Sequence, residues 1–336
     1  MRPEELLIPT DKGLYCPPGD FYIDPVAPVA RALITHGHAD HARSGHGAVM
    51  ATRETLDIMA IRYGEDFTRE QQAAAFGKDI RHNGVAVQFA PAGHVLGSAQ
   101  IRVEWQGLRI TVSGDYKRLA DPTCAAYQPL ACDIFITEAT FGLPVFRHPT
   151  PMHEMDKLFA SLKANPDRTH MIGAYALGKA QRVIRLIRDS GQDEPIYIHG
   201  SLQRLCDYYR EQGIELGVLL PATSETSKKS DFAGKIVIAP PSAFAARWAQ
   251  RFADPLLGFA SGWMQIRARA RQRLTELPLI ISDHCDWNEL TDTITELNPQ
   301  EVWVTHGREE ALVRWCALNQ RKAKPLHLVG YEDEAE

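Results

Sequence analysis

The chain has 336 residues, of which 44% are apolar, which predicts a large domain with an insertion, or two domains, built around hydrophobic cores. The formal net charge of −5 argues against a strongly basic nucleic-acid-binding protein, although a local basic groove can lie on an acidic protein. No apolar run is long enough to span a membrane, and Met1–Glu5 lacks the pattern of a signal peptide. We therefore expect a cytoplasmic protein that does not enter membranes.

The six cysteines are scattered and form no Cys-x-x-Cys pair, which predicts reduced thiols. Cys285 lies beside a candidate site residue. Two interpretations stay open for it: packing in the core, which we favour, or lining of a cleft.

Short strands and turns are predicted for residues 6–30, with strands at 6–8, 13–15 and 21–25 and a turn at Pro17–Asp20. Asp24 ends the last of these strands. It is either a turn-capping residue or a brace that accepts N–H groups from the loop that follows.

Three histidines and an aspartate lie close together in Thr35–His41, directly after the apolar run 31–34. His36 and His38 are two residues apart, so in an extended segment they point the same way. Imidazole nitrogen and carboxylate oxygen are ligands that suit zinc and related divalent metals. His36 and His38 could hold one ion while Asp40 and His41 hold another. A polar surface loop is the alternative, but so dense a cluster has no evident packing reason.

Further polar residues follow predicted strands at regular places along the chain. After a helix at 52–63, the strand 85–89 leads to His94, which lies between Gly93 and Gly97 in a tight loop. A hairpin is predicted from 100–105 and 108–112 around Gln106-Gly107, and its second strand leads to Asp115. The strand 133–140 contains Glu138 near its end. Polar residues at successive strand ends predict one site at one edge of a sheet system.

Residues 142–262 have a different pattern, in which strands and helices alternate. Strands are predicted at 170–175, 196–200 and 235–239, and helices at 152–164, 178–187, 202–211 and 243–251. This alternation predicts a small parallel sheet with its own core, inserted into the first domain. Residues 223–231 are expected to form a solvated loop, and His170 and His199 to have structural roles.

The first pattern returns after residue 262. Arg267, Arg269, Arg271 and Arg273 form a basic run that is either a solvated helix face or a path for phosphates. Two more strands are predicted, at 277–282 and 301–305, and they end beside His284 and His306. We therefore predict a first domain from residues 1–141 and 263–330, an insert at 142–262, and a disordered acidic tail at 331–336.

The segments His36-Gly37-His38-Ala39-Asp40-His41, His94, Asp115 and His306 resemble the metallo-β-lactamase superfamily. Thr-Glu-Ala-Thr-Phe-Gly (137–142), Ser-Asp-His-Cys-Asp (282–286) and Val-Thr-His-Gly (304–307), with the insert, resemble its β-CASP nucleases. The short length, the Asp-Lys-Gly-Leu-Tyr-Cys-Pro start (11–17) and Phe259–Trp263 look most like bacterial ligase-associated DNA exonucleases, which are similar to mRNA 3′-end processing nucleases. The resemblance implies an α/β fold: a metallo-β-lactamase αββα sandwich with an inserted β-CASP α/β domain.

The resemblance also implies a set of residue roles. His36, His38 and His94 would hold one divalent metal ion, Asp40, His41 and His306 a second, and Asp115 would bridge them. Zinc is the expected metal, and manganese also suits mixed histidine and carboxylate ligands. Asp40, Glu138 and His284 make up the implied catalytic set, with His284 as general acid oriented by Glu138 and with Asp24 bracing the first loop.

The implied activity is that of a DNA exonuclease in ligase-associated repair, acting on single-stranded DNA in preference to RNA and associated with a DNA ligase and a helicase. Candidate phosphate contacts are Lys117, Lys179, Arg182, Arg267 and Arg271. An RNA nuclease of the mRNA 3′-end processing type would use the same residues. The insert and His284 argue against a thioester or lactam hydrolase, and the complete set of expected ligands argues against a scaffold with a dead site.

Overall fold

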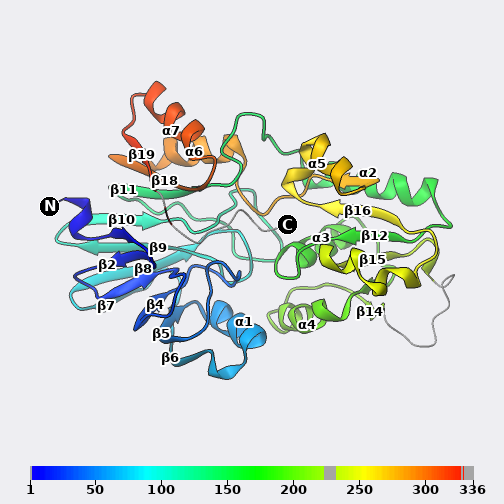
Figure 1. The fold of residues 1–336 in the computed structure, drawn as a ribbon, viewed down its shortest axis with the longest axis horizontal. Helices are drawn as coiled ribbons and strands as arrows, with labels where there is room; N and C mark the ends of the chain where they lie inside the picture. Colours follow the sequence, from blue (N-terminus) through cyan, green and yellow to red (C-terminus); the bar gives the residue numbers. More distant parts are fainter. Residues whose placement is uncertain (1, 223–231, 327, 329–336) are drawn as a thin grey trace. The chain divides into compact units, whose positions relative to one another are not determined.

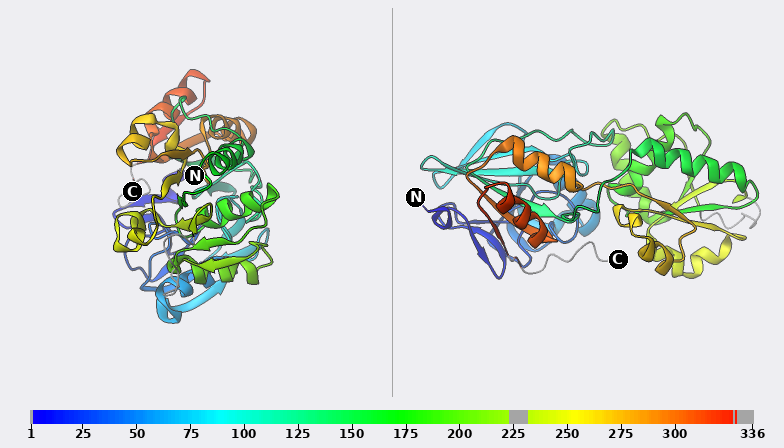
Figure 2. Two further views of the ribbon diagram at one scale, coloured as in Figure 1. Left: turned by 90° about the vertical axis from the view of Figure 1, so that its right-hand side faces the viewer. Right: turned by 90° about the horizontal axis from the view of Figure 1, so that it is seen from above.

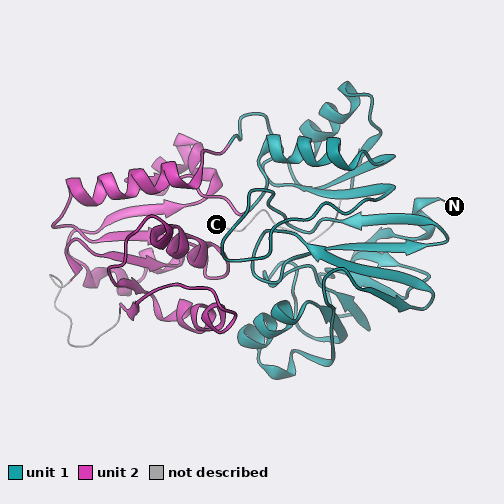
Figure 3. Ribbon diagram, turned by 180° about the vertical axis from the view of Figure 1, so that it is seen from behind, with its two compact units in different colours: residues 1–147, 284–335 teal, residues 148–283, 336 magenta. Residues whose placement is uncertain are grey.

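The computed structural model describes residues 2–222, 232–326 and 328 (Figure 1). The loop expected at 223–231 and the acidic tail expected at 331–336 lie outside these residues. The chain divides into two compact units, which Figure 3 shows in different colours: residues 1–147 with 284–335, and residues 148–283. Each unit is described by itself.

The first sheet of unit 1 has six strands in chain order. Its members are β1 (Ile8–Thr10), β2 (Gly13–Cys16), β3 (Phe21–Ile23), β4 (Arg31–Leu33), β5 (His46–Ala51) and β6 (Thr68–Ala73). The pairs β1–β2 and β2–β3 are antiparallel, and the remaining pairs are parallel. Helix α1 (Arg53–Tyr63) follows β5, and its N-terminus is capped by the Thr52 side chain, which accepts a hydrogen bond from the Thr55 N–H. Two short 3-10 helices, η1 (Pro3–Glu5) and η2 (Glu65–Phe67), complete this part.

The second sheet of unit 1 has seven strands in the order β19-β18-β11-β10-β9-β8-β7. Its members are β7 (Asp79–His82), β8 (Val85–Pro91), β9 (Ala99–Trp105), β10 (Leu108–Val112), β11 (Ile134–Ala139), β18 (Glu301–Gly307) and β19 (Ala323–Pro325). The predicted hairpin is confirmed: β9 and β10 pair antiparallel, and Gln106 and Gly107 at its tip both have positive φ, as a tight two-residue turn requires. The strands β10, β11, β18 and β19 pair parallel.

Side chains alternate between two cores across the seven-stranded sheet. On β18, Trp303 belongs to a cluster shared with Phe21, Ile23 and Leu33 of the first sheet, so the two sheets pack face to face. Its neighbours Val302 and Val304 belong to a second cluster on the opposite face. That cluster includes residues of α6 (Trp287–Leu297) and α7 (Glu309–Leu318), which therefore cover this face (Figure 2, right).

A smaller cluster lies on the outer face of the first sheet. Ile34, Val49 and Ala51 pack there against Leu56 and Met59 of α1. Helix α1 is thereby fixed beside the loop that follows β4.

Unit 2 contains one parallel sheet of six strands in the order β14-β13-β15-β12-β16-β17. The strands are β12 (His170–Gly173), β13 (Ile196–Ile198), β14 (Leu219–Pro221), β15 (Ile236–Ala239), β16 (Leu256–Ala260) and β17 (Leu277–Leu279). Its helices include α2 (Pro151–Ala164), α3 (Lys179–Asp189), α4 (Gln203–Glu211) and α5 (Arg267–Gln272), with η3 (Gly200–Leu202) and η7 (Gly262–Gln265) as 3-10 turns. The mixed α/β class predicted from the sequence is confirmed for both units.

Two details of unit 2 differ from the sequence-based expectation. The helix expected at 243–251 is two 3-10 helices, η5 (Pro241–Ala245) and η6 (Arg247–Arg251), because Ala246 between them is extended. Residues 263–283, which we assigned to the first domain, group with unit 2, because β17 pairs with β16. A pattern read only along the chain does not reveal this pairing.

Trp303 is the largest fully buried side chain of the core between the two sheets. Replacing it with alanine removes a large apolar surface and leaves a cavity, so we expect Trp303→Ala to lower the free energy of unfolding by about 3–5 kcal/mol. Chemical denaturation followed by circular dichroism measures this. Leu318→Ala is the control, because Leu318 is 66% exposed and its truncation is expected to change stability by less than about 0.5 kcal/mol. Equal effects of the two substitutions would contradict the assignment of Trp303 to this core.

Candidate metal centre

The loop after β4 is held by the carboxylate of Asp24. Asp24 has positive φ and accepts hydrogen bonds from the Thr35 N–H at 2.8 Å and from the Thr35 hydroxyl at 2.6 Å. Its Oδ2 also lies 2.8 Å from Nδ1 of His41. The carboxylate is 3% exposed, so these contacts replace water around it. One buried group therefore fixes both ends of the histidine-rich loop and leaves Nε2 of His41 to face the next ligands.

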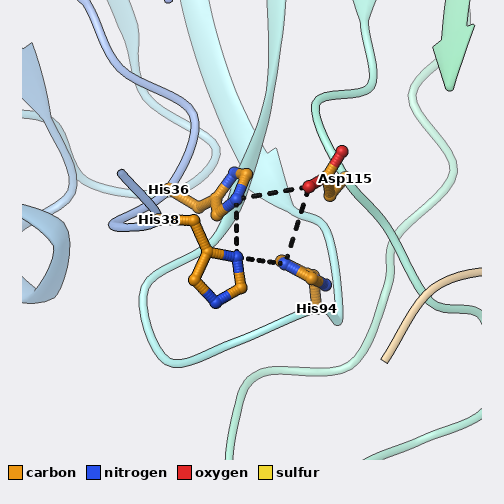
Figure 4. A group of neighbouring side chains, drawn as sticks. All are labelled: His36, His38, His94 and Asp115. Carbon is orange, nitrogen blue, oxygen red and sulfur yellow. Dashed lines mark hydrogen bonds and ion pairs between the residues drawn. The ribbon is translucent and has the colours of Figure 1, made fainter. Parts of the chain in front are cut away.

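Four donor atoms converge beside this loop (Figure 4). Nδ1 of His38 lies 3.1 Å from Nε2 of His36 and 3.0 Å from Nε2 of His94. Oδ2 of Asp115 lies 3.4 Å from Nε2 of His36 and 3.8 Å from Nε2 of His94. Zinc–nitrogen bonds of about 2.0–2.1 Å in a tetrahedron would set the donors about 3.4 Å apart. The spacing and the chemistry of these donors fit a divalent metal ion.

A second group of donors surrounds His41. Its Nε2 lies 3.6 Å from Oδ2 of Asp40 and 3.4 Å from Oδ2 of Asp115. The rings of His41 and His306 are 5.4 Å apart, so His306 at the end of β18 reaches the same place. The same Asp115 oxygen thus lies 3.4 Å from a nitrogen of each group. This is the placement expected of an oxygen shared by two ions.

The electrostatics of the site separate the histidines into two states. Burial and the neighbouring His41 hold the pKa of His36 well below its usual range, and the same two causes lower the pKa of His306 to about 4. Burial opposes protonation of His41 too, but the carboxylates of Asp115 and Asp40 outweigh it and raise its pKa. Burial acts to raise the pKa of Asp115, but His41 and His284 hold it well below its usual range. His36 and His306 are therefore neutral donors at neutral pH, and Asp115 is ionised.

The ligand loops approach one another so closely that two of them need glycine. Gly114, just before Asp115, has φ of +55°, and a Cβ there would lie 2.8 Å from Cβ of Thr35. Gly93, just before His94, has φ of +75°, and a Cβ there would lie 2.2 Å from the carbonyl oxygen of Lys117. Both positions require a residue without a side chain. The glycines thus allow the loops carrying His36, His94 and Asp115 to come together.

Helix α1 supports two ligand loops, a role that the sequence analysis missed. Arg62 Nη1 donates to the carbonyl of Gly37 at 2.5 Å. The hydroxyls of Thr52 and Thr55 donate to the carbonyl of Gly97 at 2.7 and 3.2 Å. The Thr52 N-cap pattern was visible in the sequence, but its contact with a residue 45 positions away was not.

Glu138 and His284 form a buried pair beside Asp115. Nδ1 of His284 lies 2.8 Å from Oε2 of Glu138, and both side chains are at most 3% exposed. Glu138 also accepts from the Tyr116 N–H at 2.8 Å and from the Thr140 hydroxyl at 2.5 Å. Burial raises the pKa of Glu138 despite the nearby His284. Ligand-type atoms of Asp115, Glu138 and His284 lie within 4.8 Å of one another, so His284 stands next to the metal-binding donors.

A second carboxylate, Glu289 on α6, connects the loops after Asp115 and His284. It accepts from Nζ of Lys117 at 2.5 Å, from the Leu119 N–H at 2.7 Å and from the Asp286 N–H at 3.1 Å. The Asp286 side chain in turn caps α6 by accepting from the Glu289 N–H. Asp-x-x-Glu at 286–289 was a visible capping signal that the sequence analysis did not use.

The candidate phosphate contacts divide into buried and exposed residues. Lys117 is 5% exposed and paired with Glu289, so it supports the Asp115 loop from within. Lys179 is 1% exposed and paired with Asp283, and Arg182 is 5% exposed and donates to the Ser282 carbonyl. Arg267 and Arg271 are exposed. Of the five, only these two present their side chains to solvent.

His170, His199 and Cys285 make ordinary structural contacts. His170 lies 2.9 Å from the Ser161 hydroxyl and His199 lies 2.8 Å from the Ser201 hydroxyl. Cys285 is fully buried in the cluster under α6, and burial raises the pKa of its thiol. This favours packing over lining of a cleft.

No family model matches the chain. A "Probable DNA ligase" of Opitutus terrae is 25% identical over 321 residues, covering 90% of this chain and 30% of the relative. "Cleavage and polyadenylation specificity factor subunit 3" of Dictyostelium discoideum is 30% identical over 215 residues, covering 52% of this chain and 27% of the relative. "Endoribonuclease YSH1" of Candida glabrata is 32% identical over 137 residues, covering 37% of this chain and 18% of the relative.

The chain spans less than a third of the length of these relatives. Among solved structures, a protein of unknown function from Enterococcus faecalis matches with a TM-score of 0.57 and 14% identity, covering 90% of this chain and 80% of that one. At this identity the match supports the fold alone.

The fold and the converging donors define an α/β protein with buried histidine and aspartate clusters able to hold metal ions. Two of these relatives are named as a cleavage factor subunit and an endoribonuclease, and the similarity to them supports the β-CASP family of the metallo-β-lactamase superfamily for this chain. In the described part of the chain, no helix is both long and apolar enough to cross a membrane.

Asp24 holds Thr35 and His41 through its carboxylate, so we expect it to affect metal binding through the position and charge of the loop. We expect Asp24→Asn to weaken metal binding about 10- to 100-fold, because the amide cannot accept all of the hydrogen bonds that fix Thr35 and His41. Competition with a chromophoric zinc chelator measures the affinity. Asp11→Asn removes the same charge at an exposed turn and should bind zinc like the unaltered protein. Equal affinities for Asp24→Asn and the unaltered protein would rule out this supporting role.

Proposed function

We propose that the protein is a metal-dependent nuclease that hydrolyses phosphodiester bonds at a pair of divalent ions. The observation that carries this proposal is the shared oxygen of Asp115, which lies 3.4 Å from Nε2 of His36 and from Nε2 of His41. Two donor groups joined by one carboxylate suit a two-metal site for in-line attack on phosphorus. The β-CASP relatives, which include a protein named an endoribonuclease, support the same class of reaction.

The fold is proposed to be a metallo-β-lactamase αββα sandwich with an inserted β-CASP domain. Two sheets that share a core, with α1 outside one and α6 and α7 outside the other, support the sandwich. The parallel sheet of unit 2 supports an inserted α/β domain. The sequence places the insert at 142–262, and the compact unit spans 148–283.

The proposed ligands follow from the two donor groups. His36, His38 and His94 hold the first ion, Asp40, His41 and His306 hold the second, and Asp115 contributes to both. Zinc is the expected metal and manganese also suits this donor set. When bound, the ions supply Lewis-acid activation of water and neutralise charge on the phosphodiester.

His284 is proposed as the general acid. With Nδ1 held at 2.8 Å from Glu138, the ring is fixed and its Nε2 is the atom that delivers a proton to the leaving oxygen. Glu138 is a positioning residue, because it orients His284 and is itself oriented by the Tyr116 N–H and the Thr140 hydroxyl. Asp40 serves the catalytic set by holding the second ion.

The substrate is proposed to be single-stranded DNA, digested from an end in repair linked to a DNA ligase and a helicase. A relative named as a probable DNA ligase, aligned over 90% of this chain, supports this choice. RNA is the second candidate, because relatives named after RNA cleavage are 30% and 32% identical over shorter segments. The hydrolytic residues would be the same for both.

A paired digestion tests the proposal. Zinc- or manganese-loaded protein is incubated with matched single-stranded DNA and RNA, labelled at either end, and with closed circular single-stranded DNA. We expect the linear DNA to be degraded while the circle and the RNA are spared, and the position of the label gives the direction. Preferential loss of RNA or cutting of the circle would assign the protein to RNA processing or to endonucleases. No cleavage of any substrate at full metal content would overturn the nuclease assignment.

His284→Ala separates proton transfer from metal binding. We expect both ions to be retained and the cleavage rate to fall by about a hundredfold to ten-thousandfold, because a lost general acid typically costs this much. Elemental analysis and initial rates measure the two quantities. His153→Ala, at an exposed position of α2, serves as the control and should cleave normally. A His284→Ala protein that cleaves at the unaltered rate would exclude the general-acid role.

A further inference from the structure

The arginine run of unit 2 has two different faces. The run lies on α5, which follows β16 and the turn η7. Ser261 caps η7 by accepting a hydrogen bond from the Trp263 N–H. Arginines alternate at 267, 269, 271 and 273, so 269 and 273 share one side of the helix and 267 and 271 the other. The arginines on the two sides differ in their contacts and in their exposure.

The inner pair lies on aromatic rings. The guanidinium carbon of Arg269 is 4.0 Å from the ring centre of Trp263, and that of Arg273 is 4.6 Å from the ring centre of Phe259. Both rings are nearly buried, at 9% and 4% exposure. Cation–π contacts at these distances are attractive, and they attach α5 to the carboxyl end of β16. Ala270, buried between them, completes the inner face.

The outer pair, Arg267 and Arg271, points away from this attachment. Both side chains are exposed, and within the described residues neither forms an ion pair. The helix contains no acidic residue. The nearest acid after the run, Glu276, is engaged by the guanidinium of Arg168 at 2.9 and 3.0 Å. The outer face therefore carries two positive charges that no ion pair among the described residues neutralises.

Such an exposed basic face is available to an anion. Four arginines within seven residues repel one another, and a helix of six residues has little stability of its own. The aromatic contacts offset this for the inner pair only. Planar guanidinium groups one helical turn apart are suited to bidentate contacts with successive phosphates of a strand.

We propose that Arg267 and Arg271 form a phosphodiester contact surface and that the Arg269–Trp263 and Arg273–Phe259 stacks hold it rigid. The ligand is the backbone of a single-stranded nucleic acid. This inference rests on the proposed nuclease function and adds a contact to the phosphates of the strand. Because the contact is to phosphate, it is blind to base sequence and to the 2′-hydroxyl, and it binds DNA and RNA alike.

Salt dependence of binding is the sharpest test. Fluorescence anisotropy with a labelled single strand, without added divalent metal, gives the dissociation constant between low and moderate salt. For Arg267→Gln/Arg271→Gln we expect the slope of log affinity against log salt to fall by about 1.4, since each phosphate contact with a single strand contributes about 0.7. The loss should be the same for DNA and RNA and for different base sequences.

Two further double variants control for charge and for folding. Arg69→Gln/Arg314→Gln removes the same charge at exposed positions of β6 and α7 and should leave the slope unchanged. Arg269→Gln/Arg273→Gln should lower the melting temperature by about 3 °C, whereas the outer pair should not, because only the inner pair contacts the rings. An outer-pair variant that melts early would overturn the division into two faces.

A small substrate separates this inference from the proposed function. Hydrolysis of bis(p-nitrophenyl) phosphate needs the metal centre but no extended strand, so the outer-pair variant should hydrolyse it at the unaltered rate. If the unaltered protein hydrolyses no phosphodiester, the proposed function fails. If it does, and the outer-pair variant keeps the full salt slope with strands, the phosphate surface on α5 is wrong while the nuclease assignment stands.

Discussion

One carboxylate oxygen, Oδ2 of Asp115, governs the arrangement of the site. It lies 3.4 Å from nitrogens of both His36 and His41, at a position that is almost fully buried. A buried carboxylate is costly unless charged or polar partners surround it. The imidazoles of His41 and His284 supply that compensation, which is why the pKa of Asp115 is held low against the effect of burial. The donors are therefore mutually dependent, and each is poorly placed without the others.

The loops that carry these donors are held by groups that never reach the centre. Asp24 fixes the loop after β4, Thr52 and Thr55 of α1 fix the loop after His94, and Glu289 of α6 fixes the loop after Asp115. Each of these groups hydrogen-bonds to backbone N–H or carbonyl groups. It therefore fixes the path of the chain, and the metal-binding side chains project from that path. Strand ends place the ligands approximately, and these contacts set the final distances.

Much of the site could be predicted from the sequence because its residues follow strands. His36, His38, His94, Asp115, Glu138 and His306 each lie at or just beyond a strand end, and alternation along the strands revealed most of those strands. The residues that hold the ligand loops in place were harder to predict. Arg62 contacts Gly37 across 25 positions and Lys117 contacts Glu289 across 172, and no local pattern encodes such pairs. The segment 243–251 was mistaken for one helix because helix-like apolar spacing does not reveal the extended Ala246 between two 3-10 turns.

The same electrostatics connect metal binding to folding. His41 lies between the carboxylates of Asp24, Asp40 and Asp115, which raise its pKa although burial opposes this. A proton on His41 thus balances part of the buried negative charge, and a divalent ion at this place must displace that proton. His36 and His306 have lowered pKa values, so they need not lose a proton to bind a metal ion. Metal affinity at the His41 group is therefore expected to fall as the pH is lowered. A bound ion would replace the proton in neutralising the carboxylates. Because these carboxylates and imidazoles come together only in the folded chain, the free energy of metal binding adds to the stability of unit 1.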